Sequence, residues 1–268
     1  MCRMAAYLGP PAPLSTLLYD PPHSLYVQAY KPREQVHGNV NVDGTGVAWW
    51  ERAGQGEPLC YTSERTPWSD PNLPRLAPRL SGAVQLAAVR SATEGIPVGP
   101  GNVHPFAHGR IAFTHNGFMG AFRQHTGRPL LERLPDHLFA EYSAVSDSLA
   151  LFLTVLRHLE GEAGGDLVQA VRAAAGEALA LCEEHGAPGV LNVLASNGRR
   201  IVATRAAVNT QANSLHVLEG GAGRRDALLV ASEPLDADPL WRPVPDGSLL
   251  ELTPEGLREM PLLDPSIP

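Results

Sequence analysis

A cysteine at position 2 is the first side chain of this 268-residue sequence with clear nucleophilic chemistry. The small side chain of Cys2 favours removal of Met1, so the mature chain is expected to begin at Cys2. A terminal cysteine carries a thiol, with a reference pKa of about 8.5, beside an α-amine whose reference pKa is about 7.7–8.0. The amine could therefore accept the thiol proton near neutral pH, and one residue would supply both nucleophile and base. Position 2 alone is also compatible with a cysteine that has no function.

Four further residues, at three places in the chain, carry groups that could bind a substrate. Arg90 follows an apolar run, and an arginine at a strand end offers a planar fork for a carboxylate. Asn116 and Gly117 follow another apolar run, where an amide side chain and a backbone N–H could both face a developing oxyanion. Asp147 stands in the first turn of a predicted helix. A surface salt bridge, an ordinary turn and simple helix capping are the respective alternatives for these positions.

The elements that must position these groups follow from the apolar pattern. Apolar spacing predicts helices over 14–19, 136–142, 147–159 and 167–185, and Ser146 is a suitable N-cap for the third. Strand-length apolar runs lie at 3–8, 46–50, 58–62, 83–89, 111–114, 190–195, 200–204, 215–218, 227–231 and 249–252. The order of strands, helices and strands favours an α+β layered domain.

Glycine and proline are expected to end several of these elements. The first strand should stop at Gly9-Pro10-Pro11, and the strand at 111–114 should stop at His115-Asn116-Gly117. Asn197-Gly198 predicts a tight hairpin between the strands at 190–195 and 200–204. The long Gly- and Pro-rich stretch 91–109 is typical of a functional loop.

Composition excludes several classes of protein. The net charge of −7 argues against a basic groove that would bind nucleic acid and against a surface that would bind anionic membranes. The sequence contains no apolar run of the roughly 20 residues needed to span a bilayer, and three scattered cysteines make no disulfide framework. His104 and His108 have metal-ligand spacing, but Pro105 argues against a helix there, so no metal is expected. We expect a cytoplasmic protein.

The candidate residues fall within a recognisable series of motifs. In chain order these are Met-Cys at the start, Arg-x-Ala-Thr at 90–93, Asn-x-His-Pro-Phe at 102–106, His-Asn-Gly at 115–117 and Ser-Asp-Ser at 146–148. This series resembles the class II glutamine amidotransferases. The resemblance implies the four-layer αββα sandwich of the N-terminal-nucleophile hydrolases, in a single domain over residues 1–268 that uses no cofactor.

The resemblance also implies a role for each motif residue. Cys2 would attack the γ-carbonyl of a glutamyl amide to form a thioester, with its own α-amine as the base. Asn116 and Gly117 would form the oxyanion hole. Arg90 and Thr93 would bind the α-carboxylate of the substrate, and Asp147 would bind its α-ammonium. His115, which precedes Asn116 in the His-Asn-Gly motif, would also belong to the substrate-binding residues.

Flanking segments narrow the resemblance to one branch of the family. Residues 21–25, 37–44, 231–236 and 241–245 are similar to the stand-alone branch that acts in ergothioneine biosynthesis. This implies hydrolysis of the γ-glutamyl amide bond of γ-glutamyl-hercynylcysteine S-oxide, a small-molecule substrate, with no nucleic-acid or membrane partner. The alternatives are a glutaminase subunit that supplies ammonia to a separate synthase, and a non-catalytic γ-glutamyl-binding module. The oligomeric state stays open.

Overall fold

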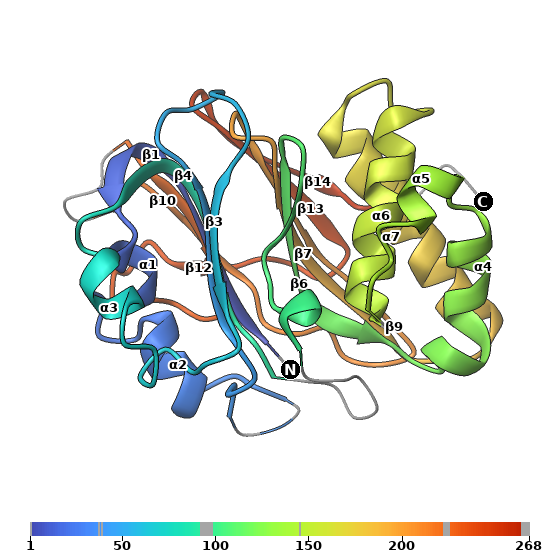
Figure 1. The fold of residues 1–268 in the computed structure, drawn as a ribbon, viewed down its shortest axis with the longest axis horizontal. Coiled ribbons are helices and arrows are strands. Elements are labelled where there is room, and N and C mark those ends of the chain that lie inside the picture. The colour runs from blue at the N-terminus through green and yellow to red at the C-terminus, as the bar shows by residue number, and fades with distance from the viewer. Residues whose placement is uncertain are drawn as a thin grey trace.

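Two antiparallel β-sheets stack face to face, and helices cover the outer side of each (Figure 1). The computed structural model describes residues 2–36, 38, 40–91, 99–144, 146–221 and 226–263. Helices α1–α3 lie against one sheet and α4–α7 against the other, so the layers run helix, sheet, sheet, helix. The predicted αββα architecture is confirmed.

The first sheet contains seven strands. In spatial order they are β12 (Arg242–Pro243), β10 (His216–Glu219), β11 (Leu228–Ala231), β1 (Arg3–Pro13), β4 (Ser81–Val89), β2 (Thr45–Trp50) and β3 (Leu59–Ser63). Its helices are α1 (Ser15–Leu18), α2 (Leu25–Tyr30) and α3 (Leu73–Leu76). Strands from residues 3–89 and from residues 216–243 thus share one sheet, with β1 at its centre.

The second sheet is built from the middle and the end of the chain. Its strands, in spatial order, are β14 (Gly256–Pro261), β13 (Ser248–Thr253), β8 (Ile201–Arg205), β7 (Gly189–Ser196), β6 (Ile111–Met119) and β5 (Phe106–His108), with β9 (Ala207–Val208) also paired to β7. Its helices are α4 (Gly127–Glu132), α5 (Asp136–Phe139), α6 (Asp147–Glu160) and α7 (Leu167–Glu184). A 3-10 turn, η1 (Pro100–Asn102), precedes β5, and a π-helical turn, η2 (Phe122–Thr126), precedes α4.

Alternation along β1 shows how one strand serves two apolar layers. Met4, Ala6 and Leu8 belong to the cluster between the sheets, whereas Ala5 and Tyr7 face the helices on the outer side. Successive side chains of a strand point to opposite faces, so a strand buried on both sides reads as a continuous apolar run. This explains why the N-terminal segment lies in the middle of the protein.

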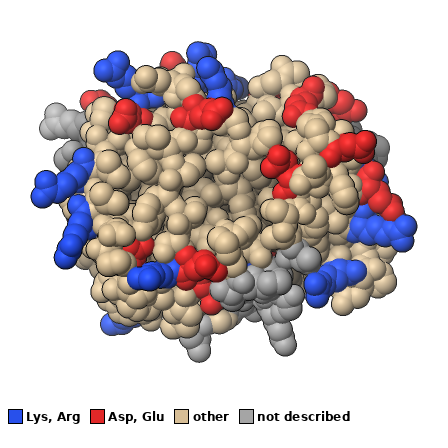
Figure 2. Space-filling model, in the orientation of Figure 1, with Lys and Arg blue, Asp and Glu red and all other residues tan. Residues whose placement is uncertain are grey.

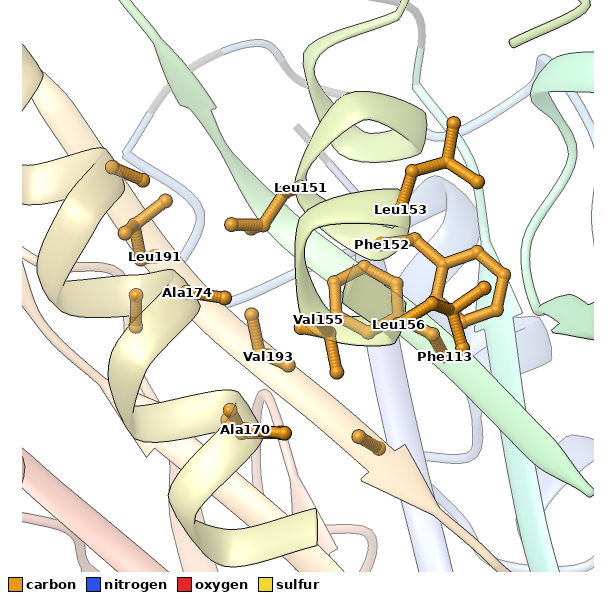
Figure 3. Close-up of a cluster of buried hydrophobic side chains, with 14 of the residues drawn as sticks. Phe113, Leu151, Phe152, Leu153, Val155, Leu156, Ala170, Ala174, Leu191 and Val193 are labelled. Atoms are coloured by element: carbon orange, nitrogen blue, oxygen red, sulfur yellow. The ribbon is translucent and has the colours of Figure 1, made fainter. Parts of the chain in front are cut away.

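Helices α6 and α7 pack on the second sheet through a large apolar cluster (Figure 3). Phe152 of α6 stacks on Phe113 of β6 with ring centroids 5.3 Å apart. At the start of α6, the Ser146 Oγ accepts a hydrogen bond from the Leu149 N–H at 3.3 Å, which confirms the predicted N-cap. The cap orders the first turn of α6, and the cluster packs the helix against β6.

Two predicted strand ends are wrong. Strand β1 continues through the Gly-Pro-Pro segment to Pro13, because Ala12 resumes pairing with Gly82 of β4 after an irregularity. Strand β6 continues to Met119, because its pairing with β7 extends that far, so Asn116 and Gly117 lie within a strand and not in a turn. The short helices α2, α3 and α4 and the strands β5, β9, β12 and β14 are not predicted by the sequence pattern.

The surface carries both signs of charge. On the face shown in Figure 2, basic and acidic side chains lie mainly around the rim and are intermixed, while the centre is largely uncharged. No helix within the described ranges is long and apolar enough to cross a membrane.

Candidate active site

A narrow pocket of about 20 Å³ lies where β1 begins, β4 ends and α6 begins. It is lined by Cys2, Arg90, Ser91, Asn102, His104, His115, Gly117, Ser146, Asp147 and Ser148. Five of the seven predicted site residues are in this set. Asn116 is fully buried beside the pocket, and Thr93 lies outside the described residues.

The strand register brings Cys2 next to Arg90. Arg3 of β1 is opposite Val89 of β4, so the next antiparallel step places Cys2 beside Arg90. Cys2 is 7% exposed, and its Sγ lies 3.9 Å from the carbonyl oxygen of Ser91. The thiol is therefore sheltered at the wall of a pocket that Arg90 also lines.

Arg90 is held by the segment that leads into β2. Its backbone N–H donates to the Gly44 carbonyl at 2.8 Å, and its Nη1 lies 3.5 Å from the Asp43 carbonyl oxygen. The side chain is 5% exposed. A buried guanidinium at the pocket wall is suited to bind a carboxylate through two parallel hydrogen bonds.

Asp147 lies across the pocket, in the first turn of α6. Its Oδ2 accepts a hydrogen bond from the Met119 N–H at 2.9 Å, and its Oδ1 accepts one from the Ser148 N–H at 2.8 Å. These bonds tie α6 to the end of β6 and fix the carboxylate orientation. The remaining lone pairs suit a cationic group such as an ammonium.

His115 joins β6 to both α6 and β7. Its Nε2 lies 2.9 Å from the Val190 carbonyl oxygen, and its Nδ1 lies 2.9 Å from the Ser148 Oγ. A carbonyl only accepts, so Nε2 carries the proton and Nδ1 accepts from the serine hydroxyl. Burial lowers the pKa of His115, although the Asp147 charge and the Val190 bond oppose this. Both ring nitrogens are therefore engaged within the protein.

His104 is a second buried histidine at the pocket. Burial, reinforced by the neighbouring His115 and Arg90, lowers the pKa of His104 to about 3, so the ring is neutral at physiological pH. Its Nδ1 lies 3.4 Å from the Thr114 Oγ1. Within the described ranges, no three His, Cys, Asp or Glu side chains converge in a way that could hold a metal.

Asn116 and Gly117 point to opposite sides of β6. The side chain of Asn116 lies between the sheets, where its Nδ2 donates to the Ser232 Oγ at 3.3 Å. A Cβ at position 117 would come 1.8 Å from the Val190 carbonyl oxygen, so only glycine fits there. The absence of a side chain at 117 is what allows His115 to reach Val190.

A buried ion pair lies next to the nucleophile. Arg3 Nε and Glu233 Oε1 are 3.1 Å apart, and both side chains are almost fully buried. Burial alone would raise the pKa of Glu233. The carboxylate, however, accepts hydrogen bonds from His23 and from the backbone N–H groups of Arg33 and Glu34. Together with the positive charge of Arg3, these bonds lower the pKa overall. Glu233 therefore ties the start of β1 to the segment after α2.

Ser232 and Asn213 were not singled out from the sequence, although both contact Asn116. Ser232 stands in one of the flanking segments that carry the family resemblance, which could have drawn attention to it. Asn213 lies in a polar stretch without any motif.

The model of the family described as "Glutamine amidotransferases class-II" matches residues 22–260. The chain belongs to the class II glutamine amidotransferases. The match includes Arg90, Asn116, Gly117 and Asp147, and it begins after Cys2.

Relatives of this amidotransferase-family chain extend the match to nearly its full length. It is 35% identical to the γ-glutamyl-hercynylcysteine sulfoxide hydrolase of Mycolicibacterium smegmatis, over 94% of this chain and 96% of that one. The protein of the same name from Mycobacterium tuberculosis is 36% identical, over 96% of this chain and 95% of that one. The family and these hydrolases together show that the chain is an amidohydrolase.

Solved structures agree on the fold. A glutamine aminotransferase class-II domain protein from Silicibacter pomeroyi superposes with a TM-score of 0.69 at 25% identity, over 98% of this chain and all of that one. The phosphoribosylpyrophosphate amidotransferase of Bacillus subtilis superposes with a TM-score of 0.69 at 17% identity, over 98% of this chain and 49% of that one.

Proposed function

We propose that this enzyme hydrolyses the γ-glutamyl amide bond of γ-glutamyl-hercynylcysteine S-oxide, releasing glutamate and hercynylcysteine S-oxide in ergothioneine biosynthesis. The observation that carries the proposal is the meeting of Cys2, Arg90 and Asp147 at one pocket. A γ-glutamyl group has one carboxylate, one ammonium and one electrophilic carbonyl, and the pocket offers one partner for each. The leaving group is proposed from the two hydrolases that are 35% and 36% identical to the chain.

In the first step, the γ-carbonyl carbon is attacked by Cys2. The α-amine of Cys2 takes the thiol proton, the new C–S bond forms, and the carbonyl electrons move onto the oxygen. Asn116 and Gly117 stabilise this oxyanion through the side-chain amide and a backbone N–H. When the oxyanion collapses, the C–N bond breaks and the α-ammonium returns its proton to the leaving amine.

In the second step, water hydrolyses the glutamyl thioester. The free α-amine takes a proton from the attacking water, the C–S bond breaks, and the thiolate is reprotonated as glutamate leaves. Arg90 and Asp147 hold the α-carboxylate and the α-ammonium throughout, so the carbonyl stays aligned with Cys2. A pocket of about 20 Å³ holds roughly one water molecule, so we expect the surrounding side chains to move apart on binding.

The leaving group is tested by comparing two substrates. Glutamate release from γ-glutamyl-hercynylcysteine S-oxide should exceed release from glutamine in kcat/KM. The reverse preference would identify a glutaminase subunit that feeds a separate synthase. If the protein turned over neither substrate, it would be a non-catalytic γ-glutamyl-binding module.

The base is tested by blocking the α-amine. In a variant that retains Met1 or carries an uncleavable N-terminal tag, the Cys2 nitrogen becomes a non-basic peptide nitrogen, so turnover should be almost abolished. The same tag placed after Pro268 should leave turnover unchanged. Mass spectrometry of each protein establishes its N-terminus and reports any acyl adduct on Cys2. Full activity in a chain shown to keep its N-terminal extension would mean that a group other than the α-amine acts as the base.

A further inference from the structure

Asn213 is a buried residue, 1% exposed, in the loop between β9 and β10. Its Nδ2 donates to the backbone carbonyl of Asn116 at 3.0 Å and lies 3.2 Å from the Asn116 Oδ1. A backbone carbonyl can only accept hydrogen bonds, so the nitrogen of the Asn213 amide must face Asn116. The backbone of β6 therefore determines the orientation of the Asn213 side chain.

This orientation in turn determines that of the Asn116 amide. Because its Oδ1 faces the Asn213 nitrogen, its Nδ2 points the other way and donates to the Ser232 Oγ at 3.3 Å. The same serine oxygen accepts the Met4 N–H at 3.0 Å, two residues after Cys2 in the chain. The amide nitrogen of Asn116 is thus held on the side of β6 that faces β1, the strand that directly follows Cys2.

The loop that carries Asn213 is itself fixed by neighbouring strands. The backbone carbonyl of Asn213 accepts hydrogen bonds from the Asn192 Nδ2 at 3.1 Å and from the Arg205 Nε at 2.8 Å. Asn192 is in β7, and Arg205 is the last residue of β8. Asn213 is therefore fixed firmly enough to orient Asn116, although it lies in a loop.

We infer that Asn213 is a positioning residue that orients the amide of Asn116 so that an Nδ2–H faces the oxyanion. The inference rests on the proposed function, which makes Asn116 an oxyanion donor. If Asn213 did not orient it, a rotated amide would present its oxygen to the oxyanion and repel it. Asn213 acts through Asn116 and makes no contact with the substrate.

The test replaces Asn213 by residues that cannot donate in the same way. In Asn213→Asp, the ionised carboxylate cannot donate to the Asn116 oxygens, whereas the protonated acid can. We expect kcat for glutamate release to fall at least about tenfold relative to wild type at pH 9, with KM changed less than about threefold. The deficit should shrink as the pH is lowered to 6. Asn213→Ala should show a similar loss in kcat without the additional pH dependence.

A double variant distinguishes orientation from an independent effect. Asn116→Ala alone should lower kcat by about 10²–10³, the usual cost of losing one oxyanion donor. Adding Asn213→Ala to it should cause no further loss, because the residue that Asn213 orients is gone. A further tenfold loss in the double variant, or single Asn213 variants with wild-type kcat, would overturn the inference. A wild-type kcat for Asn116→Ala would instead show that the proposed oxyanion hole is wrong.

Gln85→Glu is the matched control for a buried amide changed to a carboxyl. Gln85 is fully buried, and its Nε2 donates to the Ala12 and Gly82 carbonyls at 2.7 and 3.0 Å. It does not line the pocket. We expect this variant to lose stability but keep kcat, and a kcat loss equal to that of Asn213→Asp would mean that the effect is general destabilisation. If glutamine proves the better substrate, all these assays use glutamine in place of γ-glutamyl-hercynylcysteine S-oxide.

Discussion

At the scale of single residues, the proposed chemistry brings two charged side chains, Arg90 and Asp147, to one pocket with Cys2. The Arg90 guanidinium lies near one backbone carbonyl oxygen, and the Asp147 carboxylate accepts hydrogen bonds from two backbone N–H groups. These backbone contacts help to hold one cationic and one anionic group at the wall of the same pocket. This is the arrangement expected for recognition of a zwitterion such as a glutamyl moiety.

Arg90→Lys should raise KM by about 10- to 100-fold and change kcat much less. Lysine keeps the charge but lacks the planar fork that binds a carboxylate through two hydrogen bonds, each worth roughly 1.5–3 kcal/mol when charged. Steady-state kinetics of glutamate release measure both constants. Arg110→Lys, at an exposed turn, is the control and should leave KM unchanged. An unchanged KM in Arg90→Lys would show that Arg90 does not bind the α-carboxylate of the glutamyl group.

At the scale of elements, β6 presents different groups to the two layers beside it. Asn116 faces the sheet that contains β1, whereas His115 reaches α6 through Ser148 and β7 through Val190. One strand thereby aligns the proposed oxyanion donor with the nucleophile strand and also locks the helix that carries Asp147. Gly117 makes the arrangement possible by leaving space for the Val190 carbonyl.

Gly117→Ala should destabilise the protein by about 1–3 kcal/mol, because a Cβ would overlap a backbone oxygen that cannot rotate away. It should also displace His115 and reduce activity. Urea unfolding followed by circular dichroism measures the change in stability. Gly99→Ala is the matched control, since its φ of 170° is extended and nothing lies within 4 Å of the added Cβ. A fully stable Gly117→Ala would show that β6 and β7 can separate at little cost.

At the scale of the whole molecule, burial of neutral histidines links stability to pH. The unfolded chain binds a proton at His104 with a pKa near 6.5, whereas the folded chain binds it only near pH 3. Below pH 6.5 the unfolded state therefore takes up more protons, and stability falls with falling pH until both states are protonated. The lowered pKa of His115 acts in the same direction.

His104→Gln should reduce this pH dependence. Between pH 6 and pH 4, the slope of the unfolding free energy should decrease by up to about 1.4 kcal/mol per pH unit relative to wild type, which corresponds to one proton. Chemical denaturation at several pH values measures the slope, and the difference between slopes is independent of any constant loss of stability in the variant. Equal slopes would mean that His104 titrates alike in the folded and unfolded states.

The amino-acid sequence by itself was enough to predict the family and the layered α+β architecture, and five of the seven proposed site residues line one pocket in the structure. The motifs that contain Arg90, Asn116 and Asp147 stand in the chain order on which the family resemblance rests, and the long amphipathic helices carry a strong local signal. The end of β6 was decided only in the tertiary structure, because pairing with β7 outweighs the local turn preference of Asn-Gly. The contact of Asn213 with Asn116 likewise joins residues 97 apart in the chain. Hydrogen bonds between distant segments depend on strand register and loop position, which no local pattern encodes.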